Sequence, residues 1–350
     1  MSRRSRGLVA ALAVVAVLLG VGGAAIALRA NDRSAVAATT TSTAPTTTAS
    51  PSTTTTTTTT PSSTSTTAPP TPWPAIPSDG VARAVVTPTG VVLAVLSTTS
   101  DGRYVARAPC GGEVTVAGTP LTGATVVLDP GHGGDEAGAL GEGGAREKDV
   151  NLAIAQETKR QLEAQGASVV LTRTGDYRIT LASRAAIAQA LHPAMFISIH
   201  HNADPDEHRT TPGAETYHQI ASADSKRAAG LVYEELFHAF SAYDIDWVAD
   251  RDAGAKYRLR ADGGDYYGIL NRTAGLTAVL SEAAFISNPP EEALLTDPAF
   301  QAVEAGAFTR AVIRYVTTSD PGSGFIDPYP RTEPAGPGGG SSGCVDPQLG

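Results

Sequence analysis

The chain has 350 residues, of which 41% are hydrophobic and 17% are charged. Lys and Arg contribute 26 positive charges and Asp and Glu 35 negative ones, a net charge of −9. Residues 1–77 alone carry +4, so the rest of the chain carries −13. An acidic body argues against a protein held to nucleic acid by its phosphates, because that binding needs clustered Lys and Arg. The length predicts one or two domains plus non-domain segments.

Residues 1–37 are predicted to be a targeting or anchoring segment. Three arginines, at positions 3, 4 and 6, precede the apolar residues 7–28. A basic head followed by an apolar run is typical of export, and a run of this length is also about enough to cross a bilayer. Ala35-Val36-Ala37 offers a cleavage site. A cleaved signal peptide and an uncleaved membrane anchor therefore both remain open, and either predicts an extracytoplasmic protein, secreted or tethered by this segment.

Residues 38–77 are predicted to be a linker. Residues 38–72 contain only Thr, Ser, Pro and Ala, with eight consecutive threonines from 53 to 60. Such a segment cannot bury enough apolar surface to offset the entropy of the chain, so we expect a disordered spacer.

The chain has two cysteines, Cys110 and Cys344. An even number of cysteines in an exported chain favours a disulfide. This one would tie the Gly- and Pro-rich tail, residues 318–350, to the start of the folded part. Two unpaired thiols are the alternative.

Residues 78–119 are predicted to form a small β element. Short Val-rich runs separated by Gly, Asp and Ser indicate antiparallel strands. The runs are residues 82–86, 91–96, 104–108 and 114–116.

Residues 120–317 show alternating strand and helix patterns. The predicted strands are residues 124–128, 168–171, 195–199, 214–217 and 277–280. The predicted helices are residues 150–165, 181–191 and 222–239, with 290–316 mostly helical. This alternation predicts an α/β fold whose mixed, mainly parallel twisted sheet has helices on both faces. Sites in such sheets collect at the carboxyl ends of the strands.

Four chemically capable side chains follow strands or begin a helix in this region. His132 lies in the glycine-rich run after the first strand, and His200-His201 ends the third. Side chains alternate along a strand, so only one of these two histidines can face the His132 loop. Glu147 begins the first helix, and Glu282 ends the last predicted strand.

Two histidines and one carboxylate with an open position form a common catalytic zinc set, and a second carboxylate can activate the metal-bound water. Each residue alone has a plainer explanation. A histidine between glycines is often a turn residue, and an acid at a helix start is favoured by the helix dipole. Their joint placement favours a site.

The motifs resemble those of the zinc-dependent N-acetylmuramoyl-L-alanine amidases, in family order. They are Val126-Val127-Leu128-Asp129-Pro130-Gly131-His132-Gly133-Gly134, Glu147-Lys148-Asp149-Val150-Asn151-Leu152, Leu171-Thr172-Arg173, Ser198-Ile199-His200-His201-Asn202-Ala203 and Glu282-Ala283-Ala284-Phe285-Ile286-Ser287-Asn288. The regions around Cys110 and Cys344 resemble the secreted amidases of actinobacteria, including mycobacteria.

The resemblance implies a phosphorylase/hydrolase-like fold and a Zn²⁺ ion held by His132, Glu147 and His200. It implies that Glu282 activates water and shuttles its proton. The substrate would be peptidoglycan or muropeptide fragments, cleaved between the lactyl group of N-acetylmuramic acid and the L-alanine of the stem peptide. Nucleic acid is not an expected partner, membrane contact is expected only through the N-terminal segment, and a monomer is expected.

The chain departs from the family pattern at Glu136-Ala137, where Asp-Pro is usual, and at Ala283-Ala284, where a glycine is common before Phe285. Neither change removes a needed group. His201 receives no role, because the family often has alanine there. The chain has no long amphipathic insertion of the kind that blocks the site in regulated members, so we expect constitutive activity on small fragments.

Three other functions fit parts of the pattern. A zinc carboxypeptidase can share the architecture, but its usual His-x-x-Glu pair is absent, since Asp135 stands three residues after His132. A metal-dependent deacetylase of wall sugars fits the motifs less well still. A catalytically silent wall-binding module would be marked by loss of Glu282 or of a ligand, and all four groups are present.

Overall fold

The structure is a computed structural model that describes residues 73–332, 334 and 338–350. All of them belong to one compact unit, residues 66–350. The predicted signal or anchor (1–37) and most of the predicted linker (38–77) lie outside the described residues. Over the described part of the chain, no helix is long and apolar enough to span a membrane.

The first described element is a five-stranded antiparallel sheet with strand order β4-β3-β2-β1-β5. Its strands are β1 (Ala84–Val86), β2 (Val92–Thr98), β3 (Tyr104–Arg107), β4 (Glu113–Val116) and β5 (Thr119–Leu121). The antiparallel β element predicted from the Val-rich runs is present. β5 is an addition that the sequence did not predict, because its three residues include a proline and only one apolar side chain.

The central sheet has six strands in the order β12-β10-β13-β8-β6-β7. They are β6 (Val126–Pro130), β7 (Val169–Leu171), β8 (Met195–Asn202), β10 (Glu215–His218), β12 (Gly254–Lys256) and β13 (Ala278–Phe285). Every neighbouring pair is parallel except β10 with β13. This confirms the predicted mixed, mainly parallel sheet. A separate two-stranded sheet pairs β9 (Glu207–Arg209) with β11 (Trp247–Ala249).

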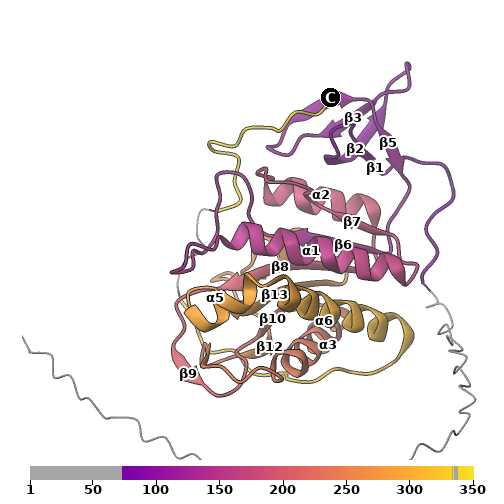
Figure 1. Ribbon diagram of the computed structural model, residues 1–350. Helices are drawn as coiled ribbons and strands as arrows, with labels where there is room; N and C mark the ends of the chain where they lie inside the picture. Colours follow the sequence, from indigo (N-terminus) through magenta and orange to yellow (C-terminus); the bar gives the residue numbers. More distant parts are fainter. Residues whose placement is uncertain (1–72, 333, 335–337) are drawn as a thin grey trace, which may run out of the picture. The chain divides into compact units, whose positions relative to one another are not determined.

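Helices cover both faces of the central sheet, as predicted (Figure 1). On one face lie α1 (Glu147–Ala164), α3 (Ala223–Phe240), α5 (Pro289–Leu295) and α6 (Pro298–Thr317). On the other lie α2 (Leu181–Leu191) and the short α4 (Gly268–Arg272). The small β element packs over α2, on the side away from the sheet (Figure 1).

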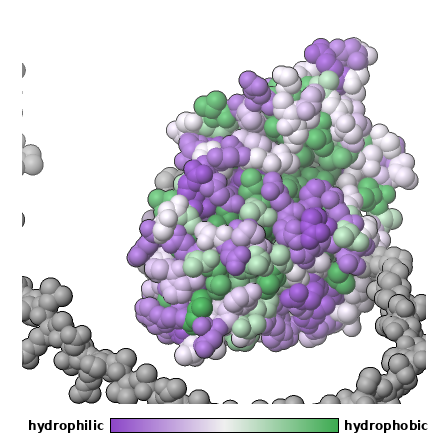
Figure 2. Space-filling view, in the orientation of Figure 1, coloured by the Kyte–Doolittle hydropathy of each residue, from purple (hydrophilic) through white to green (hydrophobic). Residues whose placement is uncertain are grey.

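Successive side chains of β6 point alternately into the two hydrophobic cores, one on each face of the central sheet. Val126 and Leu128 face the α1–α6 side, whereas Val127 faces α2. All three are fully buried, as expected for a strand covered on both faces. Large exposed apolar side chains are scattered over β2, several loops and the C-terminal tail, and the face in Figure 2 mixes hydrophilic and hydrophobic side chains.

The C-terminal tail runs back across the domain instead of ending at α6. Its Gly324 and Ile326 exchange backbone hydrogen bonds with Ala255 of β12. The tail finishes beside the small β element (Figure 1), where Cys344 forms a disulfide with Cys110, 234 residues earlier. The disulfide predicted from the cysteine count is therefore present.

Candidate active site

The loop after β6 presents His132 in a left-handed backbone conformation, with φ +60°. Few non-glycine residues adopt this conformation unless their surroundings hold them in it. Arg184 donates to the His132 and Pro130 carbonyls, both at 2.6 Å. Arg173 donates to the carbonyls of Pro130 and Gly131. Two buried guanidinium groups thus fix the loop that carries the first candidate ligand.

Three predicted ligand side chains meet at the carboxyl edge of the sheet. His132 Nε2 lies 2.9 Å from Glu147 Oε2, and His200 Nδ1 lies 3.0 Å from Glu147 Oε1. One donor atom from each residue lies within 4.8 Å of the other two. The imidazole rings meet edge to face, with centroids 4.8 Å apart. Two nitrogens and a carboxylate converging this closely match the donor chemistry of a zinc site.

The protonation states of Glu147 and His200 suit metal binding. Burial lowers the pKa of His200, which favours the neutral imidazole that binds metals. Burial opposes ionisation of Glu147, but hydrogen bonds from His132 and His200 outweigh it and hold its pKa well below the usual range. The Glu147 carboxylate is therefore ionised, and the neutral His200 imidazole has a lone pair to offer a metal.

Neighbouring groups orient the Glu147 carboxylate. Its Oε2 accepts the Ala139 N–H at 2.8 Å. Its Oε1 accepts the Asn151 amide at 3.2 Å and the His201 N–H at 3.1 Å. Glu147 and Asn151 lie four residues apart on α1, so they share one face of the helix. Such outer partners fix the orientation of metal ligands.

A buried polar chain continues from this carboxylate to α6. His201 Nδ1 lies 2.7 Å from Asn151 Oδ1, and His201 Nε2 lies 3.2 Å from Glu304 Oε1. His201 thus points away from the His132 loop, as alternation along the strand predicts. Sequence reasoning gave no role to His201, Asn151 or Glu304. The one available signal was the Glu147–Asn151 helix spacing.

Two glycines make room for the candidate ligands. A Cβ on Gly131 would overlap the His200 ring. Gly138 has φ +73°, and a Cβ there would overlap Glu147 Oε2 and lie 2.7 Å from His132 Cδ2. The backbone can approach the donor group this closely only without side chains.

Glu282 lies in β13 opposite His200 of β8 and Glu215 of β10. Residues in register on neighbouring strands share a face of the sheet, so Glu282 is on the same face as His200. Its Oε2 is buried and has no hydrogen-bond partner among the described residues. Burial and the charges of Glu147 and Glu215 raise the pKa of Glu282 well above its usual range. A carboxyl group tuned upward in this way suits proton transfer.

A second acidic group is formed by Glu215, Asp250 and Asp252, and its Glu215 is the in-register neighbour of Glu282. Buried Lys256 donates to Glu215 at 2.8 Å and to Asp252 at 2.7 Å. Arg331 bonds Asp250 and Asp252 at 2.7 and 2.6 Å. These two cations occupy the oxygens of the three acids and offset two of their charges, so we assign this group no metal.

A cavity of about 350 Å³ opens over the candidate ligands. Its walls come from the His132 loop, β8, α2 and the C-terminal tail. The lining residues are Asp129, Gly131, His132, Glu136, Gly138, Leu181, Arg184, His200, Gly338 and Gly339. The volume lies in the usual range for small-molecule sites.

The sheet and the donor group at its carboxyl edge define an α/β protein with a candidate catalytic metal centre. A family model described as N-acetylmuramoyl-L-alanine amidase matches residues 126–314, more than half of the chain. The chain belongs to this family. The enzyme class that the motifs predicted, an N-acetylmuramoyl-L-alanine amidase acting on peptidoglycan, is confirmed.

The chain is similar to proteins from several bacteria. It is 32% identical over 216 residues to the uncharacterized protein YqiI of Bacillus subtilis, covering 61% of this chain and 93% of YqiI. It is 30% identical over 224 residues to the amidase AmiC of Neisseria meningitidis, covering 55% of this chain but only 53% of AmiC. A solved N-acetylmuramoyl-L-alanine amidase from Clostridium difficile 630 aligns with 57% of this chain and 100% of its own, at 29% identity and a TM-score of 0.48.

Membership of this family disfavours the carboxypeptidase and deacetylase alternatives. The silent-module alternative is disfavoured by geometry, because the structure brings His132, Glu147 and His200 together and sets Glu282 on the same face of the sheet.

Proposed function

We propose that the chain hydrolyses the amide between the lactyl group of N-acetylmuramic acid and the L-alanine of the stem peptide, at a Zn²⁺ site formed by His132, Glu147 and His200. The observation that carries this proposal is the convergence of three donor atoms within 4.8 Å, in a chain of the amidase family. The substrate is peptidoglycan or its muropeptide fragments.

The residues present fit such an ion. The donors are two imidazoles and one ionised carboxylate, Asn151 orients that carboxylate, and the glycine backbone leaves the space above the donors open. When bound, zinc would lower the pKa of a water molecule and stabilise negative charge on the scissile carbonyl oxygen.

Glu282 is the proposed general base. Its ionised carboxylate takes a proton from the attacking water and holds it at a buried oxygen. The raised pKa makes the protonated form accessible, so the same group can deliver the proton to the departing L-alanine nitrogen. Exclusion of water around Oε2 keeps the proton from leaking to solvent before that transfer.

The remaining segments receive proposed roles that fit this reaction. Residues 120–317 form the catalytic domain, residues 78–119 a supporting β element, and residues 38–77 a spacer after the signal peptide or anchor at 1–37. The Cys110–Cys344 disulfide supports an extracytoplasmic location, because such bonds persist in oxidising compartments.

Mass spectrometry of a purified muropeptide tests the proposal. The full chain should release an intact stem peptide with a free L-alanine amine, and a chelator should abolish the release. Glu282→Gln should abolish it while still binding one equivalent of zinc. Glu142→Gln, at an exposed acid in the same domain, should cleave like the unmodified protein.

Two results would contradict the proposal. Cleavage inside the stem peptide would move the chain to the peptidases. Turnover that survives both the chelator and Glu282→Gln would refute the proposed roles of the metal and of the general base. Turnover that begins only after a partner protein is added would contradict the expected constitutive activity alone.

A further inference from the structure

Residues 338–344 of the tail, which we call the C-terminal strap, cross the edge of the candidate active site. Gly338 and Gly339 line the same cavity as His132 and His200. The strap lies far from these residues in the sequence and outside the matched family region, 126–314. Its position is therefore a property of this chain's own tail.

The inner end of the strap is bonded on both sides of Gly339. The Gly339 N–H donates to Glu136 Oε1 at 2.9 Å. The Gly339 carbonyl accepts the N–H of Leu181, the first residue of α2, at 3.0 Å. This N–H has no partner within its own helix. Gly339 has φ +75°, and a Cβ there would overlap Leu181 Cγ, so only glycine fits.

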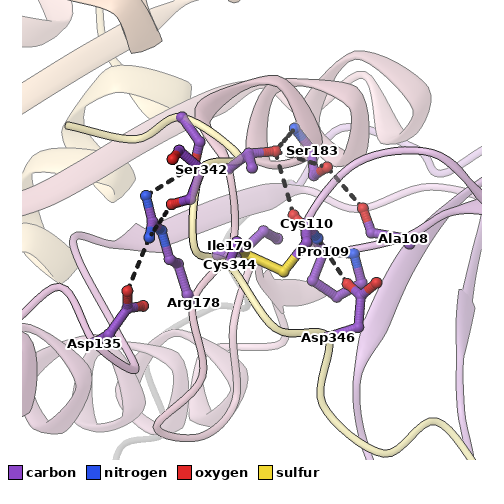
Figure 3. Close-up of a disulfide and its surroundings, with 12 residues drawn as sticks. Ala108, Pro109, Cys110, Asp135, Arg178, Ile179, Ser183, Ser342, Cys344 and Asp346 are labelled. Atoms are coloured by element: carbon purple, nitrogen blue, oxygen red, sulfur yellow. Dashed lines mark hydrogen bonds and ion pairs between the residues drawn. A yellow bond between two sulfur atoms is a disulfide. The ribbon is translucent and has the colours of Figure 1, made fainter. Parts of the chain in front are cut away.

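Arg178 holds the middle of the strap. Its Nη2 donates to the Gly340 carbonyl at 2.9 Å, and its Nη1 donates to the Ser342 carbonyl at 3.0 Å. The same guanidinium pairs with Asp135 and Glu136, each at 2.9 Å. Figure 3 shows Arg178 between Asp135 and the strap at Ser342. The acids that follow His132 are thereby tied to the tail, which gives Glu136, a departure from the family pattern, a specific partner.

The outer end of the strap is covalently fixed. Cys344 is bonded to Cys110, and the Cys110 N–H donates to Asp346 Oδ1 at 2.7 Å (Figure 3). Thr89 bonds the Gln348 carbonyl, and Leu349 packs against the core of the β element. A strap bonded at both ends and in the middle is a wall of constant position.

We propose that the C-terminal strap is a specificity-determining wall of the cleft, which admits a muramyl-peptide fragment and obstructs cross-linked peptidoglycan. The proposal rests on the proposed function, since it assumes that the bond to be cleaved lies above His132 and His200. A fragment needs room only for one sugar–peptide junction. In a polymer, the rest of the glycan strand and the cross-linked peptides must also fit past the rim of the cleft that the strap forms.

Two changes in the full chain displace the strap by independent routes. Cys344→Ser removes its covalent anchor, and Val345→Ser is the matched control, because Val345 is 81% exposed next to the disulfide. Gly339→Ala forces the strap away from Leu181 while the disulfide stays intact. Ser341→Ala, an exposed position in the strap, is its control.

The readout is kcat/KM for a soluble muropeptide and for intact sacculi. We expect Cys344→Ser to raise the value for sacculi about tenfold and to leave the muropeptide value nearly unchanged. Gly339→Ala should raise the ratio of the sacculus value to the muropeptide value, and both controls should leave this ratio unchanged. Limited proteolysis of the tail should show that the strap is released in both displaced variants.

The proposal that the strap is a specificity-determining wall would be overturned if kcat/KM changed equally for both substrates, or if the ratio stayed unchanged although the strap was released. No cleavage of either substrate by the unmodified protein would instead contradict the proposed function. Co-sedimentation with sacculi needs no turnover and tests the wall even then. More Cys344→Ser than Val345→Ser protein in the pellet supports it, and equal amounts overturn it.

Discussion

At the scale of single residues, the position of the Glu147 carboxylate depends on Asn151. The Asn151 amide donates to Glu147 Oε1 at 3.2 Å, and its oxygen faces His201. We predict that Asn151→Ala weakens zinc affinity about 10- to 100-fold, the usual cost of losing an outer partner of a ligand. Competition with a metal-sensitive chelator measures this. Gln156→Ala, exposed on the same helix, should bind zinc normally, and unchanged affinity in both variants would refute the role.

Asp129 is a second residue whose charge matters, here for stability. It is buried, accepts bonds from Arg184, Thr172 and Ser198, and is 1% exposed. Burial opposes its ionisation, but the Arg184 charge and these hydrogen bonds outweigh it and lower its pKa below the usual 3.8. Its ionised form therefore stabilises the fold above pH 3.8, and this contribution is lost as pH falls through the lowered value.

We accordingly predict that Asp129→Asn lowers the free energy of unfolding by about 3–5 kcal/mol at neutral pH, because it leaves Arg184 buried without its charged partner. The deficit should stay constant from pH 8 to pH 5 and shrink below pH 3.8. Denaturant titrations at several pH values measure it, with exposed Asp327→Asn as the control. A deficit that grows with acidity would contradict this assignment.

At the scale of elements, helix α1 carries Glu147 and Asn151, so its packing against α6 positions the candidate site. Ile154 is fully buried in the core between them. We predict that Ile154→Ala costs about 2–5 kcal/mol of stability by leaving a cavity. Thermal unfolding measures it against Gln156→Ala. A loss no larger than that of the control would mean that this part of the core adjusts freely.

The elements also show how far the sequence alone could go. α2 was predicted with its observed limits, because apolar spacing and the cap at Thr180 agree there. The apolar spacing marks α1 only from residue 150, because its first turn, which begins at Glu147 as the sequence also placed it, is polar. The predicted helix at 290–316 is two helices, because Asp297 caps α6 and Pro298 cannot continue the α5 hydrogen bonds.

The candidate site likewise contains residues that a sequence pattern marks and residues that it does not. His132, Glu147, His200 and Glu282 could be proposed from the sequence because each follows a strand or begins a helix, and functional sites of parallel sheets collect there. Arg184, Glu304 and the strap at Gly339 reach the site only through tertiary contacts. No local pattern marks such residues, so the sequence could not place them.

At the scale of the whole molecule, charge decides how the protein can hold its substrate. The chain from Ser78 onward carries −13, and stem peptides of peptidoglycan carry carboxylates. Attraction between net charges therefore cannot supply binding, and recognition must come from the cleft. We predict that the Glu282→Gln variant, used to prevent cleavage, does not lose affinity for sacculi when the salt concentration rises from about 0.05 to 0.5 M. Over this range the Debye length shortens roughly threefold.

Salt screens repulsion as well as attraction, so a modest rise in affinity with salt would agree with cleft recognition. Co-sedimentation across the salt series measures it. Arg103→Gln in the same background is the matched control, because it removes one positive charge at an exposed position and should leave the salt dependence unchanged. A steep loss of binding with salt in the parent variant would show that a basic surface, and not the cleft, holds the wall.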